Sequence, residues 1–328
     1  MFLVGFSRNG CPEQGRETAG IEEINGNLFT PKRKAAGFQT RTRNFFALQR
    51  LETRGKFNAS CCGMLQPRIL GWIFVALVFG AGWLRGADSL ERRTWIVDGV
   101  TREALFHLPE EALGRGLVPV VFAFHGHGGS MQQASRSFPI HEYWPGAIVV
   151  YPQGLPTPSP LVDRQGKRAG WQSVAGAEGD RDLKFFDVLL TSLRQQFQID
   201  PKRIYATGHS NGGSFTYLLW AERGDLFAAF APSSALLGRG FGQPSPRPVL
   251  HLGSPQDRLV KFSWQERMLD AVLALNGCGP RMPSTDGYRS YPSTKGAEVA
   301  TYLHSGGHRF PAAGTELIVK FFQSHVQP

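Results

Sequence analysis

The stretch that decides the fold of this chain runs from residue 203 to residue 213 and reads Arg-Ile-Tyr-Ala-Thr-Gly-His-Ser-Asn-Gly-Gly. Its residues 204–207 predict a short buried strand, and residues 214–223 carry apolar side chains at helical spacing. Only a tight turn joins the strand to the helix, so the central residue is forced into a strained backbone conformation. We therefore expect Ser210 to stand clear of the sheet. Gly208 and Gly212 avoid a Cβ collision where the strand and the helix crowd each other.

The three residues Gly208, Ser210 and Gly212 form the pattern G-x-S-x-G, which is typical of a nucleophile elbow. The pattern is short, and the chain contains 39 glycines, so its context has to support it. That context is favourable because a helix follows the turn directly and an Asp-Pro turn at residues 200–201 precedes the strand. The hypothesis is a nucleophilic serine, and the competing interpretation is a glycine-rich turn with a solvated serine.

Strand and helix patterns alternate through the chain after residue 88. The expected strands cover residues 94–97, 104–108, 118–124, 147–151, 204–207, 227–232, 248–252 and 299–303. The expected helices cover residues 182–197, 214–223, 264–275 and 316–323. This alternation predicts an α/β fold with a mostly parallel, doubly wound central sheet flanked by helices.

Several local features refine this picture. Asp98-Gly99 predicts a hairpin between the first two strands. Residues 155–180 are rich in Pro, Gly and Ser and predict a long loop on the active-site side, in which Trp171 is either a substrate platform or an aromatic anchor of the loop. Asp180 and Asp182 stand where acidic residues usually cap a helix.

A serine hydroxyl is a poor nucleophile at neutral pH, so it needs a base that removes its proton and a carboxylate that orients the base. Asp257 follows the strand expected at 248–252, and His308 follows the strand expected at 299–303. The carboxyl ends of parallel strands meet at one edge of a sheet, so both side chains are expected beside Ser210. The order serine, acid, histidine is that of α/β-hydrolases.

Other residues compete for the acid and base positions. His304 directly follows the last strand, whereas His308 lies beyond the Gly-Gly turn and can reach the serine. Asp270 lies within an expected helix and Asp286 in a loop rich in Pro, Ser and Gly, so Asp257 is the preferred acid.

The sequence His-Gly-His-Gly-Gly-Ser at residues 125–130 directly follows the strand expected at 118–124. A glycine-rich backbone at this point can turn N–H groups toward a pocket. We expect the backbone N–H groups of Asn211 and His127 to form the oxyanion hole. His125 and His127 have no nearby carboxylate or cysteine to complete a metal shell, so neither a metal nor a cofactor is expected.

The net charge of +10 belongs mainly to the N-terminal part of the chain. Residues 1–87 hold 12 basic and 5 acidic residues, a net charge of +7, which leaves +3 for residues 88–328. The body therefore has no strong field for polyanions, and no nucleic-acid partner is expected. Three of the four cysteines precede residue 69 and only Cys278 lies in the body, so no intrachain disulfide framework is expected there.

Residues 69–84 form an uncharged run of 16 residues between Arg68 and Arg85. As a helix the run would be about 24 Å long, short of a hydrocarbon core of roughly 30 Å. We therefore predict a signal peptide or a membrane anchor at residues 64–87, against the alternative of a buried core helix. The protein is expected to be secreted, periplasmic or extracellular, and to touch a membrane only through residues 69–84 if that run is not cleaved.

Residues 1–63 show no sustained periodicity, and Met64 stands just before the apolar run. The hypothesis is that translation begins at Met64 and that residues 1–63 are an unstructured leader or an upstream mis-start. Residues 88–328 would then be the catalytic domain.

Several short motifs occur together in one order along the chain. They are His125-Gly-His-Gly-Gly, Tyr151-Pro-Gln-Gly, Gly208-His-Ser-Asn-Gly-Gly, Asn276-Gly-Cys and Gly306-Gly-His. Over residues 93–328 the chain resembles the group of secreted α/β-hydrolases that contains polyhydroxybutyrate depolymerases and feruloyl or acetylxylan esterases. The resemblance implies an exported serine esterase without a cofactor, with Ser210 as nucleophile, Asp257 as acid and His308 as base.

The chain departs from that family in three ways. The acid loop at residues 252–257 is one residue longer than the commonest family form, Cys278 has no evident disulfide partner, and no added substrate-binding module follows the body. We therefore expect short soluble esters, hydroxybutyrate oligomers or acyl groups on plant polysaccharide rather than solid polyester. The alternatives are a serine peptidase of the prolyl-oligopeptidase-like type and a non-catalytic carbohydrate-binding relative.

Overall fold

The computed structural model describes residues 90–328 except 115, 238 and 240. The predictions for residues 1–63 and 64–87 lie outside the described residues. Among the described helices, none has the length and apolar character needed to cross a membrane.

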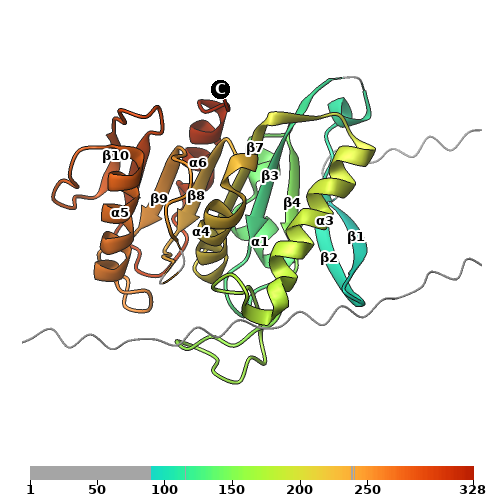
Figure 1. Cartoon of the computed structure of the whole chain (residues 1–328), viewed down its shortest axis with the longest axis horizontal. Coiled ribbons are helices and arrows are strands. Elements are labelled where there is room, and N and C mark those ends of the chain that lie inside the picture. The colour runs from blue at the N-terminus through green and yellow to red at the C-terminus, as the bar shows by residue number, and fades with distance from the viewer. Residues whose placement is uncertain (1–89, 115, 238, 240) are drawn as a thin grey trace, which may run out of the picture. The chain divides into compact units, whose positions relative to one another are not determined.

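A nine-stranded sheet forms the centre of the described part (Figure 1). Its strands are β1 (Glu91–Val97), β2 (Val100–His107), β3 (Val118–Phe124), β4 (Ile148–Pro152), β7 (Ile199–His209), β8 (Ala229–Ser233), β9 (Val249–Gly253), β10 (Gly287–Tyr291) and β11 (Val299–Leu303). They lie in the order β1-β2-β4-β3-β7-β8-β9-β11-β10. The run from β4 to β11 is parallel, and β1, β2 and β10 pair antiparallel at the two sides. The predicted α/β-hydrolase sheet, mostly parallel and doubly wound, is confirmed.

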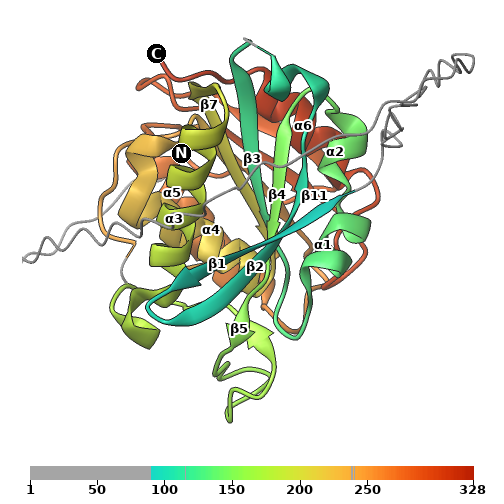
Figure 2. The same ribbon diagram turned by 90° about the vertical axis from the view of Figure 1, so that its right-hand side faces the viewer.

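Helices cover both faces of this sheet. They are α1 (Met131–Ser137), α2 (Ile140–Tyr143), α3 (Arg181–Gln196), α4 (Asn211–Arg223), α5 (Phe262–Asn276) and α6 (Gly314–Gln323), with short 3₁₀ turns at Glu110–Leu113, Ala177–Asp180 and Gly224–Leu226. Figure 2 shows α3, α4 and α5 on one side of the sheet and α1, α2 and α6 on the other. The central strands are therefore buried on both faces, as every residue of β3 is.

The alternation of side chains along β3 divides the core into two clusters. Val120, Phe122 and Phe124 pack with the helices α3, α4 and α5. Val121 and Ala123 point the other way and pack with α1, α2 and α6. The continuous apolar sequence of this strand follows from having helices on both sides.

The predicted hairpin between the first two strands is confirmed. Val97 pairs with Val100, so Asp98 and Gly99 form a two-residue turn, and both have positive φ angles. Asp and Gly tolerate this conformation better than most residues do.

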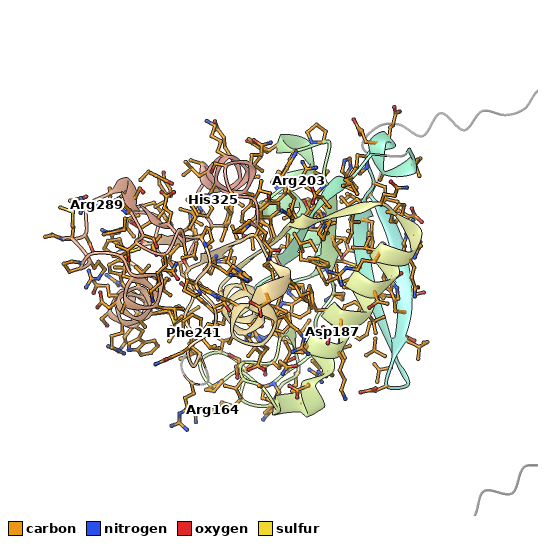
Figure 3. The ribbon with its side chains drawn as sticks, turned by 45° about the horizontal axis from the view of Figure 1, so that its top comes forward. Arg164, Asp187, Arg203, Phe241, Arg289 and His325 are labelled. Atoms are coloured by element: carbon orange, nitrogen blue, oxygen red, sulfur yellow. The ribbon has the colours of Figure 1, made fainter. Side chains whose placement is uncertain are left out.

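Some predicted boundaries were wrong. The helices α1 and α2 and the strand β10 were not expected, because each is short and lies in sequence rich in Ser, Pro or Gly. The expected loop at 155–180 contains a two-stranded sheet, β5 (Leu155–Pro156) with β6 (Ala169–Gly170). Arg164, between these strands, extends outward at the end of the molecule opposite Arg203, near the amino end of β7 (Figure 3). The loop thus lies at the carboxyl ends of the parallel strands, on the side where it was expected.

Candidate active site

The turn between β7 and α4 has the strained geometry that the sequence predicts. Ser210 has φ 56° and ψ −119°, a conformation that L-residues rarely adopt. A Cβ on Gly212 would overlap the carbonyl oxygen of Phe124, and a Cβ on Gly208 would lie 2.5 Å from the carbonyl group of Gly212. The predicted reason for the two glycines is therefore confirmed.

The structure brings the predicted nucleophile, base and acid together. His308 Nε2 lies 2.9 Å from Ser210 Oγ, and His308 Nδ1 lies 2.8 Å from Asp257 Oδ2. Asp257 follows β9 and His308 follows β11, so the two neighbouring parallel strands deliver them to the same edge. Because Oδ2 can only accept, His308 Nδ1 carries a proton and donates it, which leaves Nε2 free to accept from the serine hydroxyl.

The Asp257 carboxylate is almost completely buried, with 4% of its surface exposed. Its Oδ1 accepts hydrogen bonds from the backbone N–H groups of Leu259 and Val260, both at 3.0 Å. Its Oδ2 accepts from His308 and from the side-chain amide of Gln265. Burial alone would raise the pKa of Asp257, but the hydrogen bond and charge of His308 and the two backbone amides hold the pKa below its usual value. The carboxylate therefore stays ionised.

The competing acid and base candidates have other contacts. His304 accepts a hydrogen bond at Nδ1 from the N–H of Gly306, and burial lowers its pKa. Asp270 pairs with Arg281 at 2.9 Å. Neither residue contacts Ser210 in the described part of the chain.

The two backbone N–H groups predicted for the oxyanion hole belong to segments that flank Ser210, namely the start of α4 and the glycine-rich loop after β3. Asn211 is the first residue of α4, so its N–H has no acceptor within the helix. In the glycine-rich loop, a Cβ on Gly126 would lie 3.6 Å from Ser210 Cβ, which shows how closely the loop approaches. Gly128 N–H donates to the carbonyl of Ala169 at 2.6 Å and is not available. The assignment of His127 N–H as the second donor stays a prediction.

His125 fixes the glycine-rich loop. Its Nε2 accepts from the N–H of Gly154 at 2.9 Å, so Nδ1 carries the proton and donates to the carbonyl of Gly126 at 2.7 Å. Burial lowers the pKa of His125 to about 4, so the ring is neutral. Among the described residues, no group of three or more His, Cys, Asp or Glu side chains could hold a metal ion.

Trp171 anchors its loop. Its side chain is 1% exposed, its Nε1 donates to the carbonyl of His125 at 2.9 Å, and its ring stacks on Phe215. The backbone N–H of Trp171 donates to Asn211 Oδ1 at 2.7 Å. The substrate-platform interpretation was wrong. Trp171 instead contacts the elbow helix α4 through Asn211 and Phe215.

A pocket of about 860 Å³ opens above Ser210. Its walls come from the elbow, from the loop at 158–162, from α1, from the segment after Asp257, and from the residues beside His308. The larger apolar side chains of the wall are Phe138, Leu161, Val162, Leu236, Leu259, Val260, Trp264 and Phe310. Two arginines, Arg168 and Arg309, also line it, and no acidic residue does among those described.

Two polar contacts of the described part of the chain could not be predicted from sequence. His127 Nε2 lies 3.2 Å from Asp163 Oδ2, and this contact joins the glycine-rich loop to the β5–β6 segment. Deeper in the fold, the Arg102 guanidinium donates to Asp182 Oδ1 at 2.8 Å, and both side chains are 1% exposed or less. The helix-cap interpretation of Asp182 was therefore wrong. Asp180 makes no cap bond either and accepts from Gln172 and the N–H of Gly176.

Comparison with known sequences gives the first independent evidence on function. The chain is 25% identical over 256 residues to a probable feruloyl esterase C of Aspergillus oryzae, which covers 75% of this chain and 92% of that protein. It is also 25% identical over 229 residues to feruloyl esterase D of Neurospora crassa, covering 65% of this chain and 75% of the relative. The chain is thus similar in sequence to feruloyl esterases, and it has the α/β-hydrolase fold. The feruloyl esterase-like region also matches a bifunctional acetylxylan esterase/xylanase of Neocallimastix patriciarum at 26% identity, and there it spans a quarter of the relative's length.

Three further matches bear on the fold of this chain. Residues 168–237 match a model of the prolyl oligopeptidase family. The acetyl xylan esterase from Aspergillus awamori superposes with a TM-score of 0.56 at 16% identity, covering 72% of this chain and 99% of that one. A solved ferulic acid esterase superposes with a TM-score of 0.53 at 13% identity, covering 72% and 98%. At such identities the structures support the shared fold.

Proposed function

We propose that this protein is a serine esterase that hydrolyses carboxylic esters through an acyl-enzyme intermediate. The observation that carries the proposal is the continuous line of hydrogen bonds from Ser210 Oγ through His308 to Asp257 at the base of an open pocket. The similarity to feruloyl and acetylxylan esterases supports ester substrates.

In the acylation step, His308 Nε2 removes the proton of Ser210 Oγ while the oxygen attacks the acyl carbon. Asp257 stabilises the imidazolium that forms and keeps its Nδ1–H directed at the carboxylate. His308 then transfers the proton to the leaving alcohol as the tetrahedral intermediate collapses. In deacylation, His308 removes a proton from water as the water attacks the acyl carbon. It returns this proton to Ser210 Oγ as the acyl–oxygen bond breaks and the carboxylic acid leaves.

The negative oxygen of each tetrahedral intermediate needs hydrogen-bond donors that are already in position. We assign this role to the backbone N–H groups of Asn211 and His127. Loss of one such donor typically costs about 3 kcal/mol of transition-state stabilisation.

The pocket suits an ester with a bulky apolar portion and without positive charge. Its wall is mainly apolar, and its only charged side chains among the described residues are Arg168 and Arg309. Arg168 donates to the carbonyl of Val162 and lies 3.8 Å from the carboxylate of Asp163. Arg309 has no ionic partner in the described part of the chain. Feruloyl esters meet this description through their acyl group, and acetyl or hydroxybutyryl esters meet it where the alcohol is the bulky apolar portion.

The test is to compare the wild type with Ser210→Ala on p-nitrophenyl acetate and butyrate, and on feruloyl and hydroxybutyryl esters. We expect ester turnover by the wild type, its loss in the variant with an unchanged circular dichroism spectrum, and labelling of the wild type alone by a fluorophosphonate probe. Ester turnover that is retained in the Ser210→Ala variant would contradict the proposed serine mechanism.

A serine peptidase is the second candidate, because residues 168–237 match the prolyl oligopeptidase family. Both activities use the same acylation chemistry, so the three side chains do not distinguish them. Peptide amides assayed beside p-nitrophenyl esters decide the question, and a higher kcat/KM on the peptides would favour the peptidase.

We also propose that the protein is exported, on the evidence of the uncharged run at residues 69–84 and its flanking arginines. N-terminal sequencing of the native protein tests this proposal. A mature protein that still begins at Met1 would contradict both export by cleavage and the start at Met64.

A further inference from the structure

Three polar side chains lie buried behind the acid of the active site. Tyr217 comes from α4, His251 from β9 and Gln265 from α5, and each is 0% exposed. Tyr217 Oη lies 2.9 Å from His251 Nδ1, and His251 Nε2 lies 3.0 Å from Gln265 Oε1. Gln265 Nε2 in turn lies 3.1 Å from Asp257 Oδ2. The three side chains form one chain of hydrogen bonds that ends on the acid.

The direction of each hydrogen bond in this chain follows from the chemistry of the groups. Gln265 Nε2 can only donate, and it donates to Asp257 Oδ2 and to the carbonyl of Val260 at 2.7 Å. Its Oε1 can only accept, so His251 carries its proton on Nε2. Burial lowers the pKa of His251 to about 4, so the ring is neutral and its Nδ1 accepts from the Tyr217 hydroxyl. All the hydrogen bonds of this series therefore run in one direction, from the Tyr217 hydroxyl to the Asp257 carboxylate.

We infer that Gln265, held by His251 and Tyr217, is a positioning residue for Asp257 and therefore for the base His308. This inference rests on the proposed function. Gln265 supplies the fourth hydrogen bond of the carboxylate and also ties down the Val260 carbonyl. It thus fixes the acid and the pocket wall next to it as one unit.

The complete burial of these side chains favours a positioning role over the alternative that they only satisfy one another's hydrogen bonds. Burying polar side chains is costly, and apolar residues of similar volume would fill the same space without that cost. The surroundings are also adapted to the chain, since a Cβ on Gly253 would lie 2.8 Å from Gln265 Oε1 and 3.2 Å from His251 Nε2. Gly253 therefore leaves room for the bond between these two side chains.

The test compares Gln265→Leu with a matched control on the same helix. Asn276 is also 0% exposed, and its amide donates to the carbonyls of Arg247 and Ala297 at 2.8 and 2.9 Å. It lies eleven positions further along α5, about 16 Å away at 1.5 Å per residue. Asn276→Leu therefore removes a comparable buried amide without touching Asp257.

On p-nitrophenyl butyrate we expect Gln265→Leu to lower kcat by roughly 10- to 100-fold, as small displacements of catalytic groups do. We expect Asn276→Leu to stay within about 3-fold of the wild type. The acidic limb of kcat/KM against pH reports the protonation of His308. In Gln265→Leu this limb should move to higher pH, because the carboxylate that loses a donor attracts the imidazolium more strongly. In Asn276→Leu it should stay in place.

Gly253→Ala is a second variant, which removes no polar atom but pushes the His251–Gln265 bond apart. Like Gln265→Leu, this variant should lower kcat. It also provides the test if Gln265→Leu does not fold. The inference is overturned if the folded variants lose no more kcat than Asn276→Leu, or if the acidic limb does not rise. Ester turnover that is retained in the Ser210→Ala variant would instead overturn the proposed function. The two failures are therefore distinguishable.

Discussion

Replacing Asp257 by Asn tests the proposed mechanism most directly, because the side chain keeps its size and loses only its charge and one acceptor. All four acceptor positions of the carboxylate are occupied, by the N–H groups of Leu259 and Val260 at Oδ1 and by Gln265 and His308 at Oδ2. The new NH₂ group must face one of these pairs of donors. The backbone amides cannot turn away, so the NH₂ group takes the Oδ2 position.

In that position the amide can be accommodated only if His308 accepts at Nδ1. The proton of the neutral ring then sits on Nε2, which donates to Ser210 Oγ and can no longer act as a base. In a triad of this geometry the wrong tautomer lowers kcat by about 10⁴-fold, or roughly 5 kcal/mol. Gln265 also loses its acceptor, which adds a stability cost of about 1–3 kcal/mol.

The assay is kcat on a p-nitrophenyl ester at saturating substrate, with urea denaturation to show that the variant is folded at the assay temperature. Asp270→Asn is the control, because Asp270 lies on α5, is paired with Arg281 and does not line the pocket. A folded Asp257→Asn variant with kcat within tenfold of the wild type would refute the assignment of Asp257 as the acid.

Three further predictions concern stability and specificity. Arg102→Met should lower the free energy of unfolding by about 3–5 kcal/mol in urea titrations, because it leaves the carboxylate of Asp182 buried without its partner; a loss below 1 kcal/mol would contradict the importance of this pair. Stability should fall as the pH drops from about 6.5 to 4, since burial lowers the pKa of His125 and of His251 to about 4 and the unfolded chain binds protons first. Each histidine contributes roughly 3 kcal/mol to this loss, and equal urea midpoints at pH 7 and pH 4 would rule it out. Arg309→Ser should raise KM several-fold for esters whose acyl group ends in a carboxylate and leave KM for the matching uncharged esters unchanged; equal effects on both would exclude a charge role for this arginine.

The sequence determined the central part of the fold because that part is specified locally. The short apolar run at 118–124, rich in Val and Phe, predicted a strand buried on both faces, and it is the strand β3 with the same bounds. The glycines on either side of Ser210 could be explained before any contact was known, because only a strand that turns at once into a helix needs them. Short elements such as α2 and β10 were missed because packing, rather than their own sequence pattern, stabilises them.

Which residues meet around the serine was only partly accessible from sequence. The positions of Asp257 and His308 after successive parallel strands predicted that they would lie at one edge, since all such strand ends meet there. Trp171 could be assigned as an anchor only once its contacts with His125 and Phe215 were visible.

The partners that hold the acid were decided by tertiary structure alone. Nothing in the sequence around Gln265, His251 or Tyr217 indicates a polar role, because the three lie on two helices and a strand whose patterns predict only an apolar core. They are brought together because α4 and α5 lie on the same face of the sheet and His251 of β9 contacts one side chain from each helix. The sequence determined which positions could carry the catalytic side chains. The packing of helices on the sheet decided which other side chains hold those catalytic side chains in place, because hydrogen-bond partners far apart in the chain leave no local pattern.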